Sequence, residues 1–208
     1  MSANPADSVL REWLLRAFAL LIYGTFVAII ARYWLADTSR YTLLLLLVSE
    51  GLTVTLVLFA RRAVLRDASP VAIGATTLAL SFFLFFEYTG TRRLMPESFG
   101  VALLLCGIAC QVISKLTLGR SFGVLPAARG LVTNGPYRVV RHPIYLGYLI
   151  GHIGFLLSNF SLQNLLVLCA LYCAQTIRML REEALLSESI AYRDYTARVR
   201  WRLVPFVF

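Results

Sequence analysis

The sequence predicts an all-α membrane protein with about five to six transmembrane helices, a C-terminal helical hairpin and an amphipathic tail. Of the 208 residues, 59% are hydrophobic and only 15% are charged. A soluble domain of this length has about 45–50% apolar and about 25% charged residues. The apolar residues form runs of about 20 residues, the length at which a helix crosses a bilayer. The charged residues gather between these runs.

Six apolar runs follow one another along the chain, and each is predicted to be a helix. Arginine and aromatic side chains stand at the ends of the first run, where they can reach the membrane interface. The residues at 158–161, Ser-Asn-Phe-Ser, are a turn signal, so the last two runs are predicted to form the hairpin. The runs cover residues 13–34, 41–60, 71–88, 99–118, 144–160 and 162–177.

The segment 119–143, between the fourth and fifth runs, is rich in glycine, proline and arginine. Its backbone groups need partners, so it cannot face lipid. The tail, 178–208, is amphipathic and rich in arginine. We therefore expect one membrane domain, in which residues 1–118 supply the N-terminal transmembrane helices and residues 119–208 supply a binding loop, the hairpin and the tail.

The basic residues predict a membrane and not a nucleic acid as the partner. The net charge is +9, and Lys115 is the only lysine among the basic residues. The charges lie at the ends of apolar runs instead of forming one stripe, which is typical of anionic headgroup contacts and of the positive-inside rule. The charge bias predicts a multi-pass protein with both termini and residues 119–143 in the cytoplasm.

Other polar residues within the apolar runs are less informative. The four cysteines form two i, i+4 pairs with no histidine or carboxylate beside them, and they do not predict a metal site. A carboxylate within a membrane is a functional candidate by default. For Glu50, in the middle of a run, a functional and a structural role stay open. For Glu87, near the end of a run, an interfacial role is favoured.

The residues around position 140 carry the clearest signal for a binding site. Arg141 and His142 stand directly before Pro143, a residue that suits the first turn of a helix. Free backbone N–H groups at a helix start favour an anion, and the two side chains add donors. The nearby aromatic faces and a glycine that permits close approach belong to Tyr137, Tyr145 and Gly147. Together these residues predict a pocket for a small ligand with a carboxylate or phosphate and a flat ring.

A second group of polar residues follows the hairpin. Arg181, Glu182 and Glu183 extend the last apolar run. If the hairpin closes, its second helix returns to the side of the membrane where Arg141 and His142 lie. Paired carboxylates in that place can bind ribose hydroxyls, an ammonium group or an arginine.

These motifs, in this order, resemble the isoprenylcysteine carboxyl methyltransferase and phospholipid methyltransferase superfamily. The resemblance covers about residues 116–205, and the first three runs show no matching motif. It implies S-adenosylmethionine as cofactor, a cytoplasm-facing pocket, and a lipid-like or prenylated substrate with a carboxyl, amine or phenol acceptor. The motifs are Gly-Pro-Tyr at 135–137, Arg-His-Pro-Ile-Tyr-Leu-Gly at 141–147, Arg-Glu-Glu at 181–183, two tyrosines at 192 and 195, and Trp-Arg-Leu-Val-Pro at 201–205.

The resemblance also implies a role for each matching residue. Glu183 would lie between cofactor and substrate, and Arg141 and Arg202 would orient the substrate, so these three are the predicted catalytic residues. The predicted cofactor contacts are Tyr137, His142, Tyr145, Gly147 and Glu182.

Two other functions are compatible with parts of the sequence. A membrane reductase of the sterol-reductase type has a similar C-terminal region but binds NADPH. Such reductases tend to have asparagine before the tyrosine of this motif, and Ile144 before Tyr145 departs from that pattern. A non-catalytic membrane protein would bind no cofactor.

Overall fold

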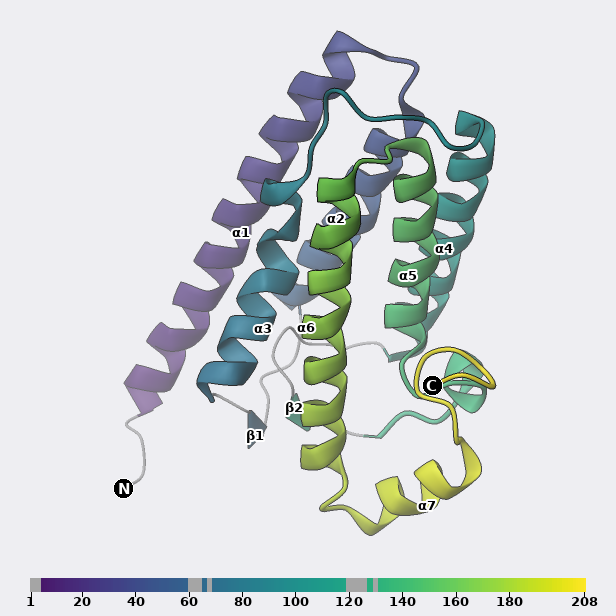
Figure 1. Ribbon diagram of the computed structural model, residues 1–208. Helices are drawn as coiled ribbons and strands as arrows, with labels where there is room; N and C mark the ends of the chain where they lie inside the picture. The colour runs from purple at the N-terminus through teal and green to yellow at the C-terminus, as the bar shows by residue number, and fades with distance from the viewer. Residues whose placement is uncertain (1–4, 60–64, 67–68, 119–126, 129–130) are drawn as a thin grey trace.

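The structure is a computed structural model that describes residues 5–59, 65–66, 69–118, 127–128 and 131–208. Long helices lie side by side along one direction, and α7 and the C-terminal segment lie at one end (Figure 1). The long helices are α1 (Pro5–Ala36), α2 (Tyr41–Phe59), α3 (Pro70–Ser81), α4 (Glu97–Leu118), α5 (Pro143–Ser158) and α6 (Leu162–Leu186). The shorter elements are β1 (Leu65–Arg66), η1 (Phe82–Phe85), β2 (Ala127–Ala128), η3 (Gly135–Arg138) and α7 (Ile190–Arg198).

Local sequence signals explain where the helices of the predicted hairpin begin. Pro143 occupies the first turn of α5, as its fixed φ angle and missing N–H allow. Asn159 ends α5, and the Ser161 hydroxyl accepts a hydrogen bond from the Asn164 N–H at 3.1 Å to cap α6. The hairpin predicted from the turn at 158–161 is therefore confirmed.

Helices α4 and α5 approach each other closely along a line of glycines. A Cβ atom placed on Gly107 would lie 2.5 Å from the Gly147 carbonyl oxygen, and one on Gly154 would lie 2.7 Å from the Gly100 carbonyl oxygen. Such backbone contacts are possible only without a side chain. The close packing fixes the start of α5, and with it residues 141 and 142, relative to α4.

An aromatic core holds the remaining helices together. Phe26 of α1, Phe82 and Phe83 of η1 and Phe155 of α5 are all buried in one cluster. The Phe26 and Phe83 ring centroids are 4.3 Å apart. His152 of α5 joins this layer through its Nδ1 atom, 2.8 Å from the Tyr172 hydroxyl of α6.

The third predicted span is shorter than expected. The run 71–88 was predicted as one helix, but helical structure ends at Phe85. The Asn164 side chain accepts a hydrogen bond from the Glu87 N–H at 2.8 Å and donates one to the Glu87 carbonyl at 3.0 Å. These bonds replace those that a continuing helix would make. The short antiparallel pair of β1 and β2 was also not predicted.

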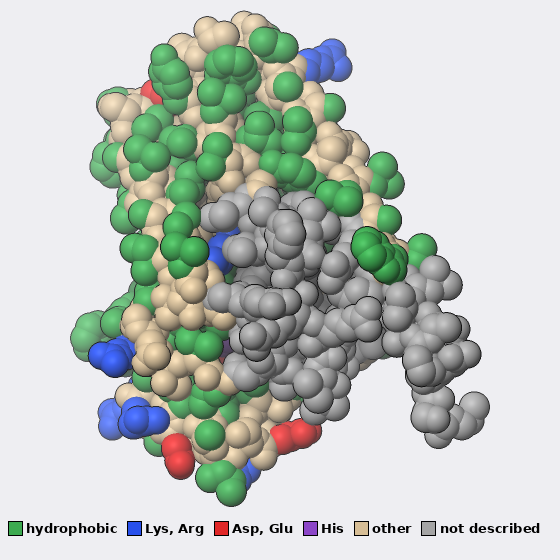
Figure 2. All heavy atoms as spheres, turned by 180° about the vertical axis from the view of Figure 1, so that it is seen from behind, with side chains coloured by type: hydrophobic (Ala, Val, Ile, Leu, Met, Phe, Trp, Pro, Cys, Tyr) green, Lys and Arg blue, Asp and Glu red, His purple; other side chains and the backbone are tan. Residues whose placement is uncertain are grey.

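Many large hydrophobic side chains are exposed along the helices. Figure 2 shows hydrophobic side chains spread over the part of one face that is not grey, with charged side chains at its upper and lower ends. Within the described residues, α4 is the one helix long and apolar enough to cross a membrane, and three further apolar helices are shorter. The number of spans therefore stays a prediction. The side chain of Glu50 and the loop residues 119–126 and 129–130 lie outside the described residues.

Candidate functional site

The candidate site begins where the C-terminal segment pairs with the start of α5. The Arg141 N–H donates to the Trp201 carbonyl at 2.9 Å, and the His142 N–H donates to the Arg202 carbonyl at 2.8 Å. These two bonds place segments that are far apart in sequence side by side. The arginine motif before α5 and the Trp-Arg-Leu-Val-Pro motif therefore form one structural unit.

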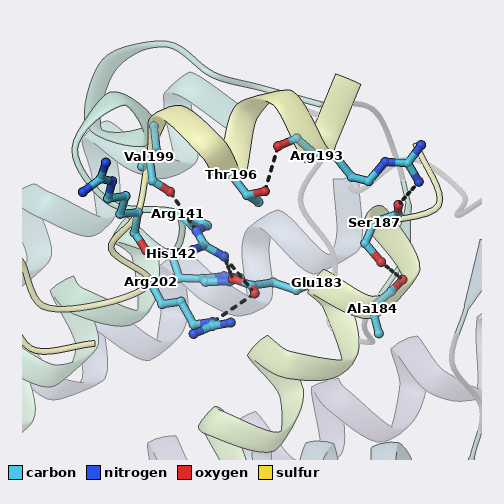
Figure 3. Close-up of polar contacts among 10 residues, drawn as sticks. Arg141, His142, Glu183, Ala184, Ser187, Arg193, Thr196, Val199 and Arg202 are labelled. Atoms are coloured by element: carbon cyan, nitrogen blue, oxygen red, sulfur yellow. Dashed lines mark hydrogen bonds and ion pairs between the residues drawn. The ribbon is translucent and has the colours of Figure 1, made fainter. Parts of the chain in front are cut away.

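Glu183, near the end of α6, lies at the centre of the site and contacts three predicted residues (Figure 3). Arg141 Nη1 is 3.0 Å from each carboxylate oxygen, and Arg202 Nε is 2.9 Å from Oε2. His142 Nε2 is 3.2 Å from Oε1. The structure thus brings together His142 and all three residues predicted to be catalytic. Their roles remain predictions.

The two arginines differ in how much of each guanidinium is already used. Arg141 also donates from Nε to the Val199 carbonyl at 2.9 Å and from Nη2 to the Arg200 carbonyl at 2.7 Å. Arg141 therefore clamps α5, α6 and the C-terminal segment together. The Arg202 side chain is 33% exposed, and within the described residues its terminal nitrogens make no hydrogen bond. Of the two, Arg202 is the arginine that is free to meet a ligand.

The surroundings of Glu183 favour its charged form. Burial alone would raise the pKa of this carboxyl, but the hydrogen bonds and charges of His142, Arg202 and Arg141 outweigh burial and hold the pKa below its ordinary value. The Glu183 carboxylate is therefore ionised at neutral pH and is a weak base.

We expect the ionisation of Glu183 to make the free energy of unfolding depend on pH in the acidic range. In the unfolded chain the Glu183 carboxyl regains its ordinary pKa of 4.5, whereas the folded protein holds the charge to lower pH. Its contribution to the free energy of unfolding is complete above that value and is lost as pH falls through the folded pKa. Urea unfolding in neutral detergent, measured between about pH 6 and about pH 3, should show that the free energy of unfolding falls more steeply with decreasing pH for the wild type than for Glu183→Gln. Equal slopes would contradict this assignment.

Glu182 differs from Glu183 in its contacts, although both residues follow the same apolar run. Its side chain is half-buried, and in the described part of the chain it has no hydrogen bond or ion pair. Burial, followed by the negative charge of Glu182, raises the pKa of the Tyr137 hydroxyl, which places these two side chains near each other. Glu182 therefore offers an acceptor that the protein itself does not use.

The remaining predicted cofactor contacts lie in different directions. Tyr145 stands edge-on to His142, with ring centroids 5.7 Å apart, and the Arg178 guanidinium lies 5.6 Å from the Tyr145 ring centroid. Gly147 packs against α4, where an added Cβ would lie 2.7 Å from the Gly107 carbonyl oxygen. Gly147 therefore allows α4 and α5 to pack closely, while its cofactor contact stays a prediction.

Four residues that contribute to the site were not among the predicted site residues. Tyr195 of α7 donates from its hydroxyl to the Tyr137 carbonyl at 2.7 Å and so ties α7 to η3. Val199 and Arg200 contribute only main-chain oxygens, which no side-chain pattern reveals. Arg178 could have been found, because it lies one helical turn before Glu182 and shares a helix face with it.

Comparisons with known proteins find a matching family and relatives for part of the chain. The phospholipid methyltransferase family profile matches residues 96–193. The chain is similar to protein-S-isoprenylcysteine O-methyltransferases A and B of Arabidopsis thaliana, at 38% and 37% identity over 63 residues. In each case the match covers 28% of this chain and 32% of the relative, so it spans about a third of the curated relatives. Residues 96–193, just under half of the chain, are therefore similar to the phospholipid methyltransferase family, and the chain also resembles isoprenylcysteine methyltransferases.

Proposed function

We propose that this protein is a membrane methyltransferase that uses S-adenosylmethionine to methylate the carboxyl group of a lipid-like or prenylated substrate on the cytoplasmic side. The observation that carries the proposal is the cluster in which Glu183 joins Arg141, His142 and Arg202. In this cluster, residues of the motif before α5 and of the motif at 201–205 all contact the carboxylate of Glu183.

The residues beside this cluster suit the methyl donor. S-adenosylmethionine carries a carboxylate, an ammonium group, ribose hydroxyls and a flat purine. His142 and the free end of Arg202 can donate to the carboxylate, and the unused Glu182 carboxylate can accept from ribose hydroxyls or the ammonium. Tyr145 supplies an aromatic face next to His142. When bound, the donor supplies an electrophilic methyl group on a good leaving group.

The state of Glu183 favours a carboxyl acceptor over an amine. An amine must lose a proton during methyl transfer, and a carboxylate held at a low pKa by three partners is a poor proton acceptor. A substrate carboxylate needs no base and is already a nucleophile at neutral pH. Arg202 can orient it, so the chain contributes mainly positioning and exclusion of water. The names of the Arabidopsis relatives agree with an oxygen acceptor.

A labelling assay tests the proposal. The full chain in lipid nanodiscs is incubated with methyl-labelled S-adenosylmethionine and a membrane lipid extract that contains prenylated cysteine derivatives. We expect label in the lipid fraction that mild alkali releases as methanol, as methyl esters do. We expect His142→Ala to bind labelled S-adenosylmethionine at least about tenfold more weakly, because the imidazole N–H that would donate to its carboxylate is lost.

Each alternative predicts a different result. Label that resists alkali indicates an amine or phenol acceptor and contradicts the carboxyl assignment. Binding of NADPH without binding of S-adenosylmethionine indicates a reductase, and binding of neither indicates a non-catalytic protein. Wild-type affinity for S-adenosylmethionine in both His142→Ala and Glu182→Ala would contradict the placement of the cofactor.

A further inference from the structure

A pocket lies beside the loop that joins α1 and α2, which is at the end of the bundle opposite α7 (Figure 1). Its volume is about 350 Å³, within the range of about 300–1,000 Å³ for small-ligand sites. The walls come from the end of α1, from the segment after η1 and from the end of α5. The residues that matter for its chemistry are Tyr33, Asp37, Arg40, Tyr88, Arg93 and Ser158.

The pocket is lined by two arginines and one aspartate, of which Arg93 and Asp37 are only loosely engaged. Arg93 Nη2 lies 3.9 Å from Asp37 Oδ2, and Arg93 Nε lies 3.9 Å from Glu97 Oε2. These distances are too long for hydrogen bonds. The Asp37 Oδ1 atom accepts from Ser39, whereas within the described residues Oδ2 accepts no hydrogen bond. Both side chains are about half exposed, so each keeps groups that a ligand can reach.

The other walls are rigid and polar. Arg40 donates from Nη1 to the Tyr88 carbonyl at 2.6 Å and from Nη2 to the Asn159 side chain, so it is fixed in place. The Tyr33 and Tyr88 rings stack with centroids 4.9 Å apart. Ser158 lines the pocket but is only 2% exposed, and its hydroxyl, which has no hydrogen-bond partner among the described residues, lies against Gly100 of α4.

The residues beside the pocket indicate how a ligand would be anchored. Leu35 is 70% exposed and directly precedes the pocket residue Ala36. Leu94 and Met95 are 46% and 43% exposed and directly follow Arg93. A polar pocket with exposed apolar residues next to it matches the interface of a bilayer, where headgroups meet acyl chains.

We propose that this pocket binds the zwitterionic headgroup of a phospholipid, with its phosphate at Arg93 and its ammonium group at Asp37. Because Arg40 is already bonded within the protein, the charged groups left available are Arg93 and Asp37, and a neighbouring cation and anion favour a ligand that carries both charges over a simple anion. The site is distinct from the Glu183 cluster and does not depend on the activity proposed above.

Calorimetric titration of the full chain in a neutral maltoside detergent tests the proposal. The probes are dihexanoylphosphatidylethanolamine, dihexanoylphosphatidylglycerol and glycerophosphoethanolamine. We expect the ethanolamine lipid to bind at least about tenfold more tightly than the glycerol lipid, which lacks the ammonium, and than the headgroup without acyl chains. Arg93→Gln should weaken the binding of both lipids about tenfold. Asp37→Asn should remove the preference for the ethanolamine lipid over the glycerol lipid.

Arg92→Gln is the matched control, because Arg92 is an exposed neighbour that does not line the pocket. It removes the same charge and should leave all three affinities unchanged. Equal binding of the two lipids to the wild type, or the same loss in Arg92→Gln as in Arg93→Gln, overturns the proposal. Glycerophosphoethanolamine binding as tightly as the lipid would show that a soluble phosphate ester is the ligand, and would also overturn it.

Discussion

Replacement of Glu183 by glutamine is expected to lower the free energy of unfolding by about 3 kcal/mol, the range seen when one partner of a buried ion pair is removed. The substitution keeps the size of the side chain but leaves the Arg141 guanidinium without its anion. The Arg141 and Glu183 side chains are each 11% exposed, so water replaces the lost contact poorly. Urea unfolding in detergent micelles measures the loss.

Glu182→Gln is the matched control for this change. It removes the same charge one residue earlier, from a side chain with no protein partner among the described residues, so we expect stability within about 0.5 kcal/mol of wild type. Its expected effect is instead on the affinity for S-adenosylmethionine. Equal unfolding curves for Glu183→Gln and the wild type would show that the cluster does not stabilise the fold.

The second large effect is expected at the contact between α4 and α5. In Gly147→Ala the new methyl group would lie 2.7 Å from both the Gly107 carbonyl oxygen and Gln111 Cγ. A main-chain atom cannot move aside as a side chain can, so the helices must separate. We expect a loss of about 3 kcal/mol, the upper end for overpacked sites. The measurement is again urea unfolding of the micellar protein.

Gly151→Ala provides the comparison on the same helix face. Its added methyl group would lie 3.4 Å from Leu104 Cδ2, the flexible end of a side chain. Alanine also favours a helix over glycine by about 1 kcal/mol, so the net change should be less than about 1 kcal/mol in either direction. Similar losses of unfolding free energy in Gly147→Ala and Gly151→Ala would mean that the close contact at Gly147 does not limit the packing of α4 and α5.

Much of the helix order could be predicted from the sequence, because apolar runs and helix-start residues act locally. The run 99–118 corresponds to α4, Glu97–Leu118, and Pro143 begins α5 as expected. The break after Phe85 could not be predicted. It depends on Asn164, a residue far along the chain whose amide replaces the main-chain bonds of a helix.

The candidate site, like the fold, could be predicted only in part from the sequence. Its side chains could be named from motifs, and the predicted return of α6 toward His142 is what brings Glu183 within 3.2 Å of the imidazole. The difference between Arg141 and Arg202 could not be read from the sequence. It is set by the carbonyl groups of Val199 and Arg200, and any residue type presents the same carbonyl.

The pairing of residues 141–142 with 201–202 also bears on how the protein is made. The ribosome releases α5 and α6 before the segment that completes the Glu183 cluster. Contacts between residues so distant in sequence close late, because loop entropy opposes them. Helices α5 and α6 are therefore complete before their charged end can close, and the Glu183 cluster closes only after residues 201–202 have been made.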